Sequence, residues 1–264
     1  MTGIYDDPAA YDLACSFREV PPEVAVLLSW CARHRPDGAP PVRSVLELAA
    51  GPAEHAREFA RRGVAATALD LHPAMCAYAA ERAAADGVAL EVVRDDMTAF
   101  SLARRFDLVV TMLDSTSHLM TLDAFTAHLD RAAAHLADGG LYIVEMAHPR
   151  DRIGDAPSVS TSWTVEGPGV RASVRWGEPD DRLDPVTQIA ADRVTMTITG
   201  AGARVVEDVV PYRFWTATEL AAAVRLSGAL EVVAQYGDFG DVALTDPHAW
   251  RMITVLRPVP RPAG

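Results

Sequence analysis

The chain has 264 residues, a length that suits either one large α/β domain or two smaller ones. Half of the residues are hydrophobic and 23% are charged, which excludes a wholly disordered chain and predicts a globular protein with a substantial core. The net charge of −12 disfavours binding to nucleic acids and to anionic membrane surfaces. A small-molecule partner is therefore the better prediction.

The cysteines and the N-terminus limit the cellular setting. Cys15, Cys31 and Cys76 are odd in number and form no CxxC pair, which predicts neither a disulfide framework nor a zinc knuckle. The first residues are acidic and lack the apolar segment of a signal peptide, and no apolar run approaches the roughly 18 residues of a membrane span. We expect a cytoplasmic protein without a membrane anchor.

Strand and helix patterns alternate through the first half of the chain. A helix is predicted over 22–34, after Pro21-Pro22, and a strand over 44–49. The further elements are helices over 54–63, 72–87 and 122–140, and strands over 64–71, 89–96, 106–114 and 141–147. This alternation predicts right-handed βαβ units and a doubly wound parallel sheet.

The second half of the chain has a different pattern of apolar residues. Residues 162–179 and 187–215 alternate with period two and contain glycine turns, which predicts a small antiparallel sheet. A helix follows over 216–229, where Thr216 and Glu219 have the spacing of a capping box. Two strands, over 230–239 and 249–258, then close the chain.

The turn from Glu47 to Ala53 is the first candidate binding element, because its small residues leave room for a ligand and the following helix exposes free amides. An ordinary turn is the alternative. Asp70 ends the next strand 23 residues after Glu47, close to the roughly 20-residue offset of a ribose-binding acid. It could equally cap the next helix, and the two roles are compatible. Asp96 and Met97, at the end of the third strand, could flank an adenine.

These segments resemble class I S-adenosylmethionine-dependent methyltransferases of the small-molecule, natural-product type. Their first motif, VLDLGCGPG, is matched by VLELAAGPA, and the resemblance covers roughly residues 40–150. It departs from the pattern at Ala49 and Ala53, where glycine is usual. Because alanine lacks glycine's freedom at positive φ, the affinity for the cofactor is the property that these changes put in question, although we still expect binding.

The resemblance implies S-adenosylmethionine as the cofactor and assigns residues to each part of it. Glu47 would lie near the methionyl amine, Asp70 on the ribose hydroxyls and Asp96 at the adenine amino group. The remaining cofactor contacts would come from the turn at Ala49 and Gly51, from Leu71, Met75 and Met97 near the nucleoside, from Met112 and Leu113 beside the methionine moiety, and from Tyr11 and Arg18 in an N-terminal lid.

The same resemblance implies an α/β fold, a doubly wound Rossmann-like methyltransferase sheet with an antiparallel β insertion after the fifth strand. The expected parts are a lid over 1–20, a cofactor-binding core over 21–150, the insertion over 151–210 on the substrate side, and a helix and strands over 211–264 that complete the sheet. Amino-sugar N-methyltransferases carry a similar insertion.

Two histidines are candidate catalytic groups. His118 follows the fourth strand, at the sheet edge where ligands of open α/β sheets bind, and its ordinary pKa of about 6.5 suits a general base. A helix cap is the alternative. His148 lies near Glu145 at the end of the fifth strand, and we expect both side chains on one face; in the alternative, Glu145 is solvated or pairs with an arginine. These residues and Asp114 lack zinc-type spacing, so no metal is predicted.

Aromatic residues and arginines after position 160 are candidates for a substrate pocket. Trp163, Trp176, Tyr212, Trp215 and Tyr236 could wall it or simply pack the sheets, and Arg175 and Arg213 could neutralise an acidic substrate. The predicted function is transfer of a methyl group to a nitrogen or oxygen, rather than a carbon, of a small molecule.

Two other functions stay open. One is a catalytically silent nucleoside-binding module with a protein partner. The other is a nicotinamide-dependent oxidoreductase, which is disfavoured because Ala49 and Glu54 stand at two glycine positions of its G-x-G-x-x-G motif. A homodimer is compatible with the sequence.

Overall fold

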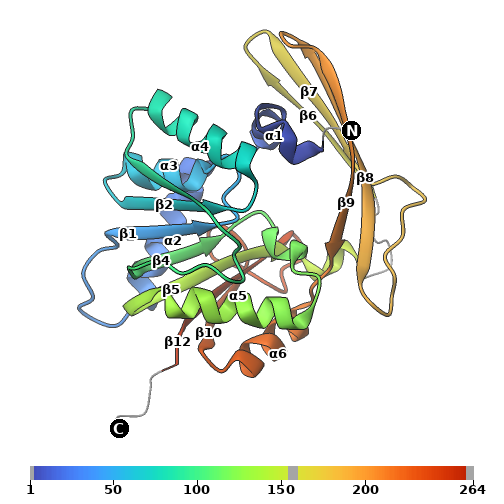
Figure 1. The fold of residues 1–264 in the computed structure, drawn as a ribbon. Helices are drawn as coiled ribbons and strands as arrows, with labels where there is room; N and C mark the ends of the chain where they lie inside the picture. Colours follow the sequence, from blue (N-terminus) through green and yellow to red (C-terminus); the bar gives the residue numbers. More distant parts are fainter. Residues whose placement is uncertain (1–2, 154–159, 260–264) are drawn as a thin grey trace.

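The computed structural model describes residues 3–153 and 160–259, which form two sheets (Figure 1). The larger sheet has eight strands in the order β11-β10-β12-β5-β4-β1-β2-β3, and the smaller has four in the order β6-β7-β8-β9. The predicted α/β fold with a doubly wound sheet and an added antiparallel sheet is confirmed.

Five parallel strands form one half of the large sheet: β1 (Ser44–Leu48), β2 (Ala65–Asp70), β3 (Leu90–Arg94), β4 (Phe106–Thr111) and β5 (Leu136–Ala147). The helices between and around them are α2 (Val20–His34), α3 (Glu54–Arg61), α4 (Pro73–Ala85), α5 (Leu122–Ala134) and α6 (Ala217–Ser227). Because β1, β2 and β4 are buried on both faces, their sequences are almost continuously apolar rather than alternating.

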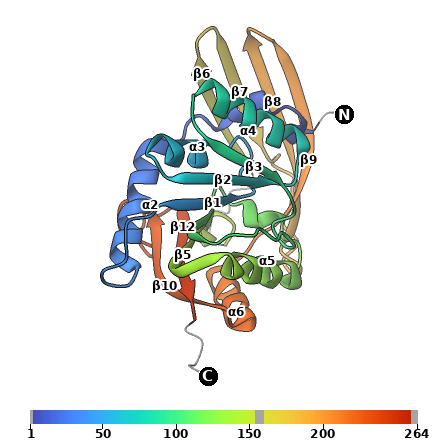
Figure 2. The same ribbon diagram turned by 60° about the vertical axis from the view of Figure 1, so that its left-hand side comes forward.

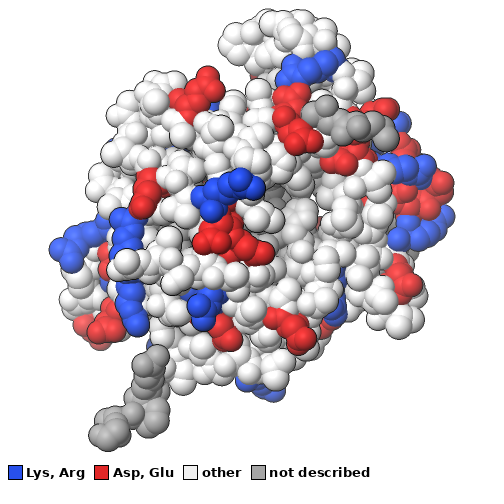
Figure 3. All heavy atoms as spheres, in the orientation of Figure 1, with Lys and Arg blue, Asp and Glu red and all other residues white. Residues whose placement is uncertain are grey.

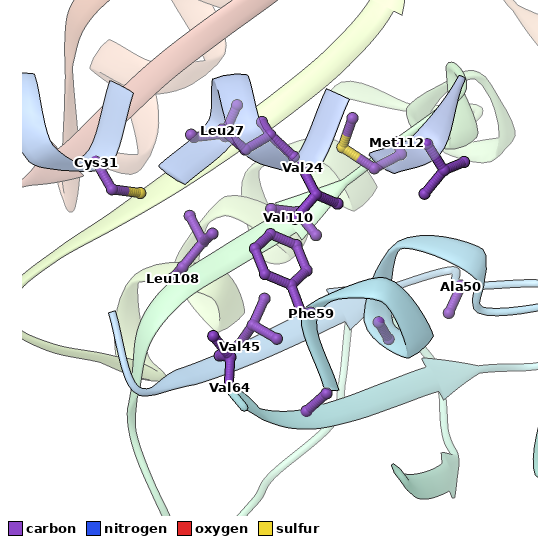
Figure 4. Close-up of a cluster of buried hydrophobic side chains, with 14 of the residues drawn as sticks. Val24, Leu27, Cys31, Val45, Ala50, Phe59, Val64, Leu108, Val110 and Met112 are labelled. Carbon is purple, nitrogen blue, oxygen red and sulfur yellow. The ribbon is translucent and has the colours of Figure 1, made fainter. Parts of the chain in front are cut away.

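Helices cover both faces of this sheet. On one face, α2 and α3 pack against the strands, and Figure 4 shows Phe59 of α3 among Val45, Val110 and the α2 residue Val24. On the other face, α5 and α6 bury a second apolar cluster, which includes Phe125. The two clusters fix the carboxyl ends of the strands, where the candidate site residues lie.

The C-terminal strands complete the sheet. β12 (Arg251–Pro258) lies antiparallel between β5 and β10 (Leu230–Asp238), and the short β11 (Val242–Ala243) forms the edge. Helix α6 begins with the predicted capping box, since Thr216 and Glu219 bond each other's backbone N–H groups. That prediction is confirmed.

The second sheet is an antiparallel meander of β6 (Thr161–Gly167), β7 (Val170–Trp176), β8 (Ile189–Gly200) and β9 (Arg204–Arg213). Its inner face packs against the N-terminal segment, which forms the short helix η1 (Ile4–Asp6) and α1 (Pro8–Cys15). Figures 1 and 2 show α1 between this sheet and the α/β core. The N-terminal segment thus joins the two sheets through an apolar contact.

Two boundaries differ from the sequence prediction. The helix predicted over 122–140 ends at Ala134, and β5 already begins at Leu136. A Cβ added at Gly140 would lie 2.9 Å from the carbonyl oxygens of Ala137 and Phe106, so only glycine fits this close approach. The first 20 residues, which show no strong periodicity, contain α1. We keep the predicted domain boundaries as a proposal.

No helix in the described ranges is long and apolar enough to cross a membrane.

Candidate functional site

A cavity of about 1200 Å³ lies at the carboxyl ends of β1 to β4, and residues of the N-terminal segment and of the second sheet also line it. A single ligand usually occupies a pocket of roughly 300–1,000 Å³, so this cavity has room for two ligands. The residues from the core that line it include Ala49, Gly51, Asp70, Asp96 and His118. Those from the N-terminal segment and the second sheet include Tyr5, Tyr11, Trp163, Trp176 and Tyr212.

The turn after β1 has an unusual backbone. Ala49, Gly51 and Ala53 all have left-handed conformations, with φ values of 50°, 52° and 57°. Glycine adopts this region without strain, whereas alanine does not. The departures from the glycine-rich pattern therefore fall at two positions where glycine is the favoured residue, and the turn keeps its shape with alanine in place.

Asp70 holds this turn. Its Oδ2 atom accepts a hydrogen bond of 2.7 Å from the Gly51 N–H, and its Oδ1 atom accepts one of 2.8 Å from the His72 N–H. Burial raises the pKa of Asp70, while these two backbone donors lower it in part. The carboxylate thus lies at the cavity wall between two strand ends, with lone pairs left for a ligand.

Apolar side chains flank this carboxylate. Leu71 is 62% exposed although it is large and apolar, and it lines the cavity together with Met75 and Met97. Asp96 also lines the cavity, and its Oδ1 atom accepts hydrogen bonds from the Thr98 N–H and hydroxyl. Together these groups form an apolar surface with a carboxylate at each side, which suits a flat heterocycle linked to a diol.

A second cavity of about 60 Å³ adjoins the first beside the β1 turn. Among its lining residues are Glu47, Met112 and Leu113, which the resemblance places beside the methionine moiety, and Tyr11 and Arg18, which it places in the N-terminal lid. The Oε2 atom of Glu47 accepts a hydrogen bond of 2.7 Å from the N–H of Ala56, in the first turn of α3. Glu47 therefore stabilises a helix N-terminus as well as lining this cavity.

A buried ionic network ties the N-terminal segment to the sheet beneath these cavities. Arg18 pairs with Glu23 at 2.6 Å and with Glu145 at 2.8 Å, and Arg251 pairs with the same two carboxylates at 3.1 and 3.3 Å. The Oε2 atom of Glu145 also accepts the N–H of Leu113 at 2.9 Å. Glu145 is thus paired with arginines, as the alternative interpretation of this residue expects, and it holds the turn after β4.

His118 lies at the end of the short helix η2 (Ser115–His118) and lines the large cavity. Its Nε2 atom is 2.9 Å from the hydroxyl of Tyr5, a residue that the sequence analysis did not single out. Burial in the surrounding protein lowers the pKa of His118, although nearby Asp70 raises it in part. The neutral imidazole is therefore favoured near pH 7, and this is the form that accepts a proton.

His148 lies elsewhere. It is buried, its Nε2 atom is 2.9 Å from the carbonyl oxygen of Leu244, and its Nδ1 atom accepts the Arg150 N–H at the start of η3 (Pro149–Asp151). It is not among the described residues that line either cavity. The expectation of a face shared with Glu145 required an even spacing on one strand, but His148 is three residues after Glu145 and lies beyond the end of β5, as the N-cap of η3.

The aromatic candidates divide into two groups. Trp163, Trp176 and Tyr212 line the cavity. Trp215 instead donates its indole N–H to the carbonyl of Leu119 in the core, and Tyr236 stacks on Trp30 with ring centroids 4.2 Å apart. These two pack the fold, as the alternative expects.

Neither candidate arginine is among the described residues that line the cavity. Arg175 pairs with Glu178, and Arg213 pairs with Glu219. Arginine and acidic side chains also lie beside one another on the face drawn in Figure 3. The arginine that does line the cavity is Arg152, which pairs with Asp192 at 2.9 Å.

Sequence reasoning missed Tyr5, Arg152 and Asp192. Asp192 carried a signal, since it occupies an inward position of β8 between the buried residues Ala190 and Val194. A charged residue on the apolar face of an alternating strand marks a polar site. Within the described ranges, no group of three or more His, Cys, Asp and Glu side chains is arranged to hold a metal ion.

Comparisons with known proteins agree with this geometry. Residues 45–140 match a family model described as a methyltransferase domain. A dTDP-3-amino-3,6-dideoxy-alpha-D-glucopyranose N,N-dimethyltransferase from Streptomyces fradiae is 36% identical over 123 residues, which are 47% of this chain and 45% of that protein. The chain therefore spans less than half the length of the curated relatives it matches.

Two solved structures have the same fold over nearly the whole chain. DesVI from Streptomyces venezuelae superposes with a TM-score of 0.77 and 22% identity, covering 95% of this chain and 98% of that one. CalS10, an amino pentose methyltransferase from Micromonospora echinaspora with S-adenosylmethionine bound, superposes with a TM-score of 0.70 and 22% identity, covering 94% of each chain. At this level of identity the likeness establishes the fold.

Proposed function

We propose that this chain, whose residues 45–140 form a methyltransferase domain, transfers a methyl group from S-adenosylmethionine to a nitrogen of a small-molecule acceptor. The observation that carries the proposal is the Asp70 carboxylate, fixed by the N–H groups of Gly51 and His72 at the wall of a cavity large enough for two ligands. The curated relative named as an amino-sugar N,N-dimethyltransferase favours nitrogen over oxygen as the acceptor atom.

The residues around Asp70 fit the nucleoside half of the cofactor. We assign Asp70 to the ribose hydroxyls, because its carboxylate lines the cavity and accepts hydrogen bonds. Leu71 and Met97 would pack on the two faces of the adenine, and Asp96 would accept its amino group. An exposed leucine is otherwise costly, and a bound ring would bury it.

The residues around the small cavity fit the methionine half. We assign the left-handed turn at Ala49 and Gly51, together with Leu113, to the amino-acid end of the methionine moiety. Tyr11 would cover this end from the N-terminal segment. Arg18 would balance the carboxylate of this moiety, although two glutamates already hold its guanidinium. Glu47, which precedes this turn, would lie near the methionyl amine.

When bound, S-adenosylmethionine supplies a methyl group on a positively charged sulfur. The protein's part is to position the acceptor in line with that group and to exclude water, since orientation in a closed site can supply most of the rate enhancement. His118, held by Tyr5, lies at the cavity wall where it can take a proton from the acceptor. His148 has a structural role in this proposal, because both of its ring nitrogens are already engaged.

Calorimetric titration of the purified chain tests the proposal, with S-adenosylmethionine, S-adenosylhomocysteine and NADH as ligands. We expect the first two to bind and NADH not to bind. Tight binding of NADH would instead favour an oxidoreductase. Binding without turnover on any amine or alcohol, together with a stable complex with another protein, would favour the silent binding module.

Asp70→Asn tests the ribose assignment. A hydrogen bond to a charged group contributes about 1.5–3 kcal/mol. Losing the charge that binds two hydroxyls therefore costs about 3 kcal/mol or more, which should weaken S-adenosylhomocysteine binding by roughly 100-fold or more. Asp123→Asn is the matched control, since Asp123 is exposed in the first turn of α5 and does not line the cavity. Equal affinities of the two variants would remove the assignment. The lack of nucleic-acid and membrane partners remains a prediction, and a homodimer remains compatible with the sequence.

A further inference from the structure

The half of the cavity away from Asp70 is acidic. Asp114, Asp151 and Asp192 line it, and Arg152 is the one arginine among the described lining residues. The sequence contains no lysine, so all 24 of its basic residues are arginines. Phosphate groups are bound by arginines, lysines and free helix amides. This wall therefore suits a cation better than a diphosphate.

Of these three carboxylates, Asp114 is the one that adjoins the proposed methionine subsite, because Leu113 beside it lines both cavities. Its backbone is left-handed, with a φ of 56°, and its Oδ1 atom accepts the Ala147 N–H at 3.1 Å. No described residue donates a hydrogen bond to its other oxygen. Burial, together with the neighbouring Glu145 and Asp151, raises the pKa of Asp114 to about 7, against the lowering effects of the Ala147 N–H and of Arg152. The carboxyl group can thus both hold an ammonium and take its proton.

Asp192 and Tyr212 form a second polar site in the acidic half of the cavity. Both are buried, with 1% and 8% of their surface exposed. The Oδ1 atom of Asp192 and the hydroxyl of Tyr212 make no hydrogen bond of good geometry with the described residues, although the two side chains interact with each other, which raises the pKa of Tyr212 and lowers that of Asp192 in part. Unsatisfied buried polar atoms that line a cavity indicate a ligand group that completes them. A hydroxyl group does so, since it donates to the carboxylate and accepts from the phenol.

Arg152 is already neutralised. Its Nη2 atom lies 2.9 Å from Asp192, and its guanidinium lies over the Tyr212 ring, 5.3 Å from the centroid. Trp163 and Trp176 stand on the same wall, and their ring faces can attract a cation. Charge, unsatisfied hydrogen bonds and aromatic surface therefore indicate the same class of ligand.

We infer that the acceptor is a cationic amino alcohol without a phosphate group, whose ammonium contacts Asp114 and whose hydroxyl group contacts Asp192 and Tyr212. This inference rests on the proposed methyl transfer and narrows it. It also separates this chain from its curated relative, which is named for an amino sugar linked to thymidine diphosphate.

The proton and electrons balance in this arrangement. In this arrangement Asp114, and not His118, takes the proton before methyl transfer. Its ionised carboxylate takes one N–H proton from the ammonium, which leaves a neutral amine with a free electron pair. That pair forms the new nitrogen–carbon bond to the methyl group as the carbon–sulfur bond breaks, and the electrons of the broken bond stay on sulfur. The products are a methylated ammonium, a neutral thioether and a protonated Asp114.

The test compares two probes in the presence of S-adenosylhomocysteine, with tryptophan fluorescence as the readout. The probes are the methyl glycoside of 3-amino-3,6-dideoxyglucose and thymidine diphosphate. We expect the amine to bind at least 10-fold more tightly, and Asp114→Asn to weaken amine binding at least 10-fold. Asparagine keeps the acceptor for the Ala147 N–H, so S-adenosylhomocysteine affinity should stay within 2-fold and serves as the check on folding.

Asp123→Asn is the matched control and should leave amine binding unchanged. Asp192→Asn should weaken the hydroxylated amine several-fold more than an analogue lacking its hydroxyl groups. Tighter binding of thymidine diphosphate than of the amine, or unchanged amine binding by Asp114→Asn, would overturn the inference. Failure of the wild-type chain to bind S-adenosylhomocysteine would instead refute the proposed function, so the two failures are distinguishable.

Discussion

Replacing Glu145 by glutamine is the sharpest stability test that the structure offers. The Glu145 carboxylate accepts hydrogen bonds from Arg18 and from the Leu113 N–H, and it pairs with Arg251, while only 3% of the residue is exposed. Glutamine has nearly the same size but no charge. The substitution therefore removes a negative charge from the centre of the network. It leaves the guanidinium groups of Arg18 and Arg251 with Glu23, which His55 also contacts, and with Asp238, which is 3.7 Å from Arg251.

The magnitude follows from this burial. Removing one partner of a buried ion pair costs about 3–5 kcal/mol, because the remaining charge stays desolvated without compensation. For a protein of this size, each kcal/mol corresponds to a change of roughly 2–4 °C in Tm. We therefore expect Glu145→Gln to lower Tm by about 6–20 °C.

The assay is thermal unfolding followed by circular dichroism, with Glu231→Gln as the matched control. Glu231 pairs with Arg257 at 2.6 Å on the same sheet, but the two side chains are 42% and 53% exposed. An exposed pair contributes about 1 kcal/mol or less, so the control should lose a few degrees at most. Equal changes in Tm for the two variants would refute the argument that burial makes the Glu145 network important.

The other predictions concern the turn, a buried histidine and a helix cap. Left-handed alanine costs about 1–2 kcal/mol and glycine loses about 0.5–1 kcal/mol of chain entropy, so Ala49→Gly should stabilise the fold by up to about 1 kcal/mol in urea unfolding. Ala53→Gly should be near neutral, because Ala53 is fully buried and losing its methyl group costs about 0.8 kcal/mol; greater stabilisation at Ala53 would contradict this account. Burial alone would lower the pKa of His55, but hydrogen bonds to two glutamates raise it to about 9. Since this is above the ordinary value of about 6.5, its contribution to stability is full below pH 6.5 and is lost as the pH rises through 9. Urea unfolding should therefore show a stability loss between pH 7 and 10 that His55→Gln reduces, and an identical pH profile would exclude the effect. Thr216→Ala should lower Tm by about 2–4 °C, from roughly 1 kcal/mol of lost capping, and an unchanged Tm would show that the cap contributes little.

The parts of the site that are local in sequence were predictable. The turn at Glu47–Ala53 and the carboxylates at Asp70 and Asp96 follow directly from strand ends, and parallel strands bring their carboxyl ends to one edge. His118 could be placed at the cavity for the same reason. The left-handed backbone at Ala49 and Ala53 was also foreseeable from the glycine pattern that they replace.

The parts that depend on distant pairing were not predictable. Arg18 meets Glu145 across 127 positions of the chain, and Arg152 meets Asp192 only because β8 folds back over the cavity. His148 lies near the sheet edge in sequence, but a carbonyl from the segment after β10 occupies its ring. Local patterns carry no information about such partners, which are set by strand order and by the way the second sheet packs.

The position of β12 between β5 and β10 has a consequence for biosynthesis. The ribosome synthesises β10 before β12. Because β12 lies between β5 and β10, β10 cannot pair in its position in the sheet until residues 251–258 have left the exit tunnel. Until then β5, whose central residues are fully buried in the finished fold, presents an open apolar edge. We expect nascent chains halted before residue 250 to be bound by chaperones more than the released protein, since the last strand closes the gap.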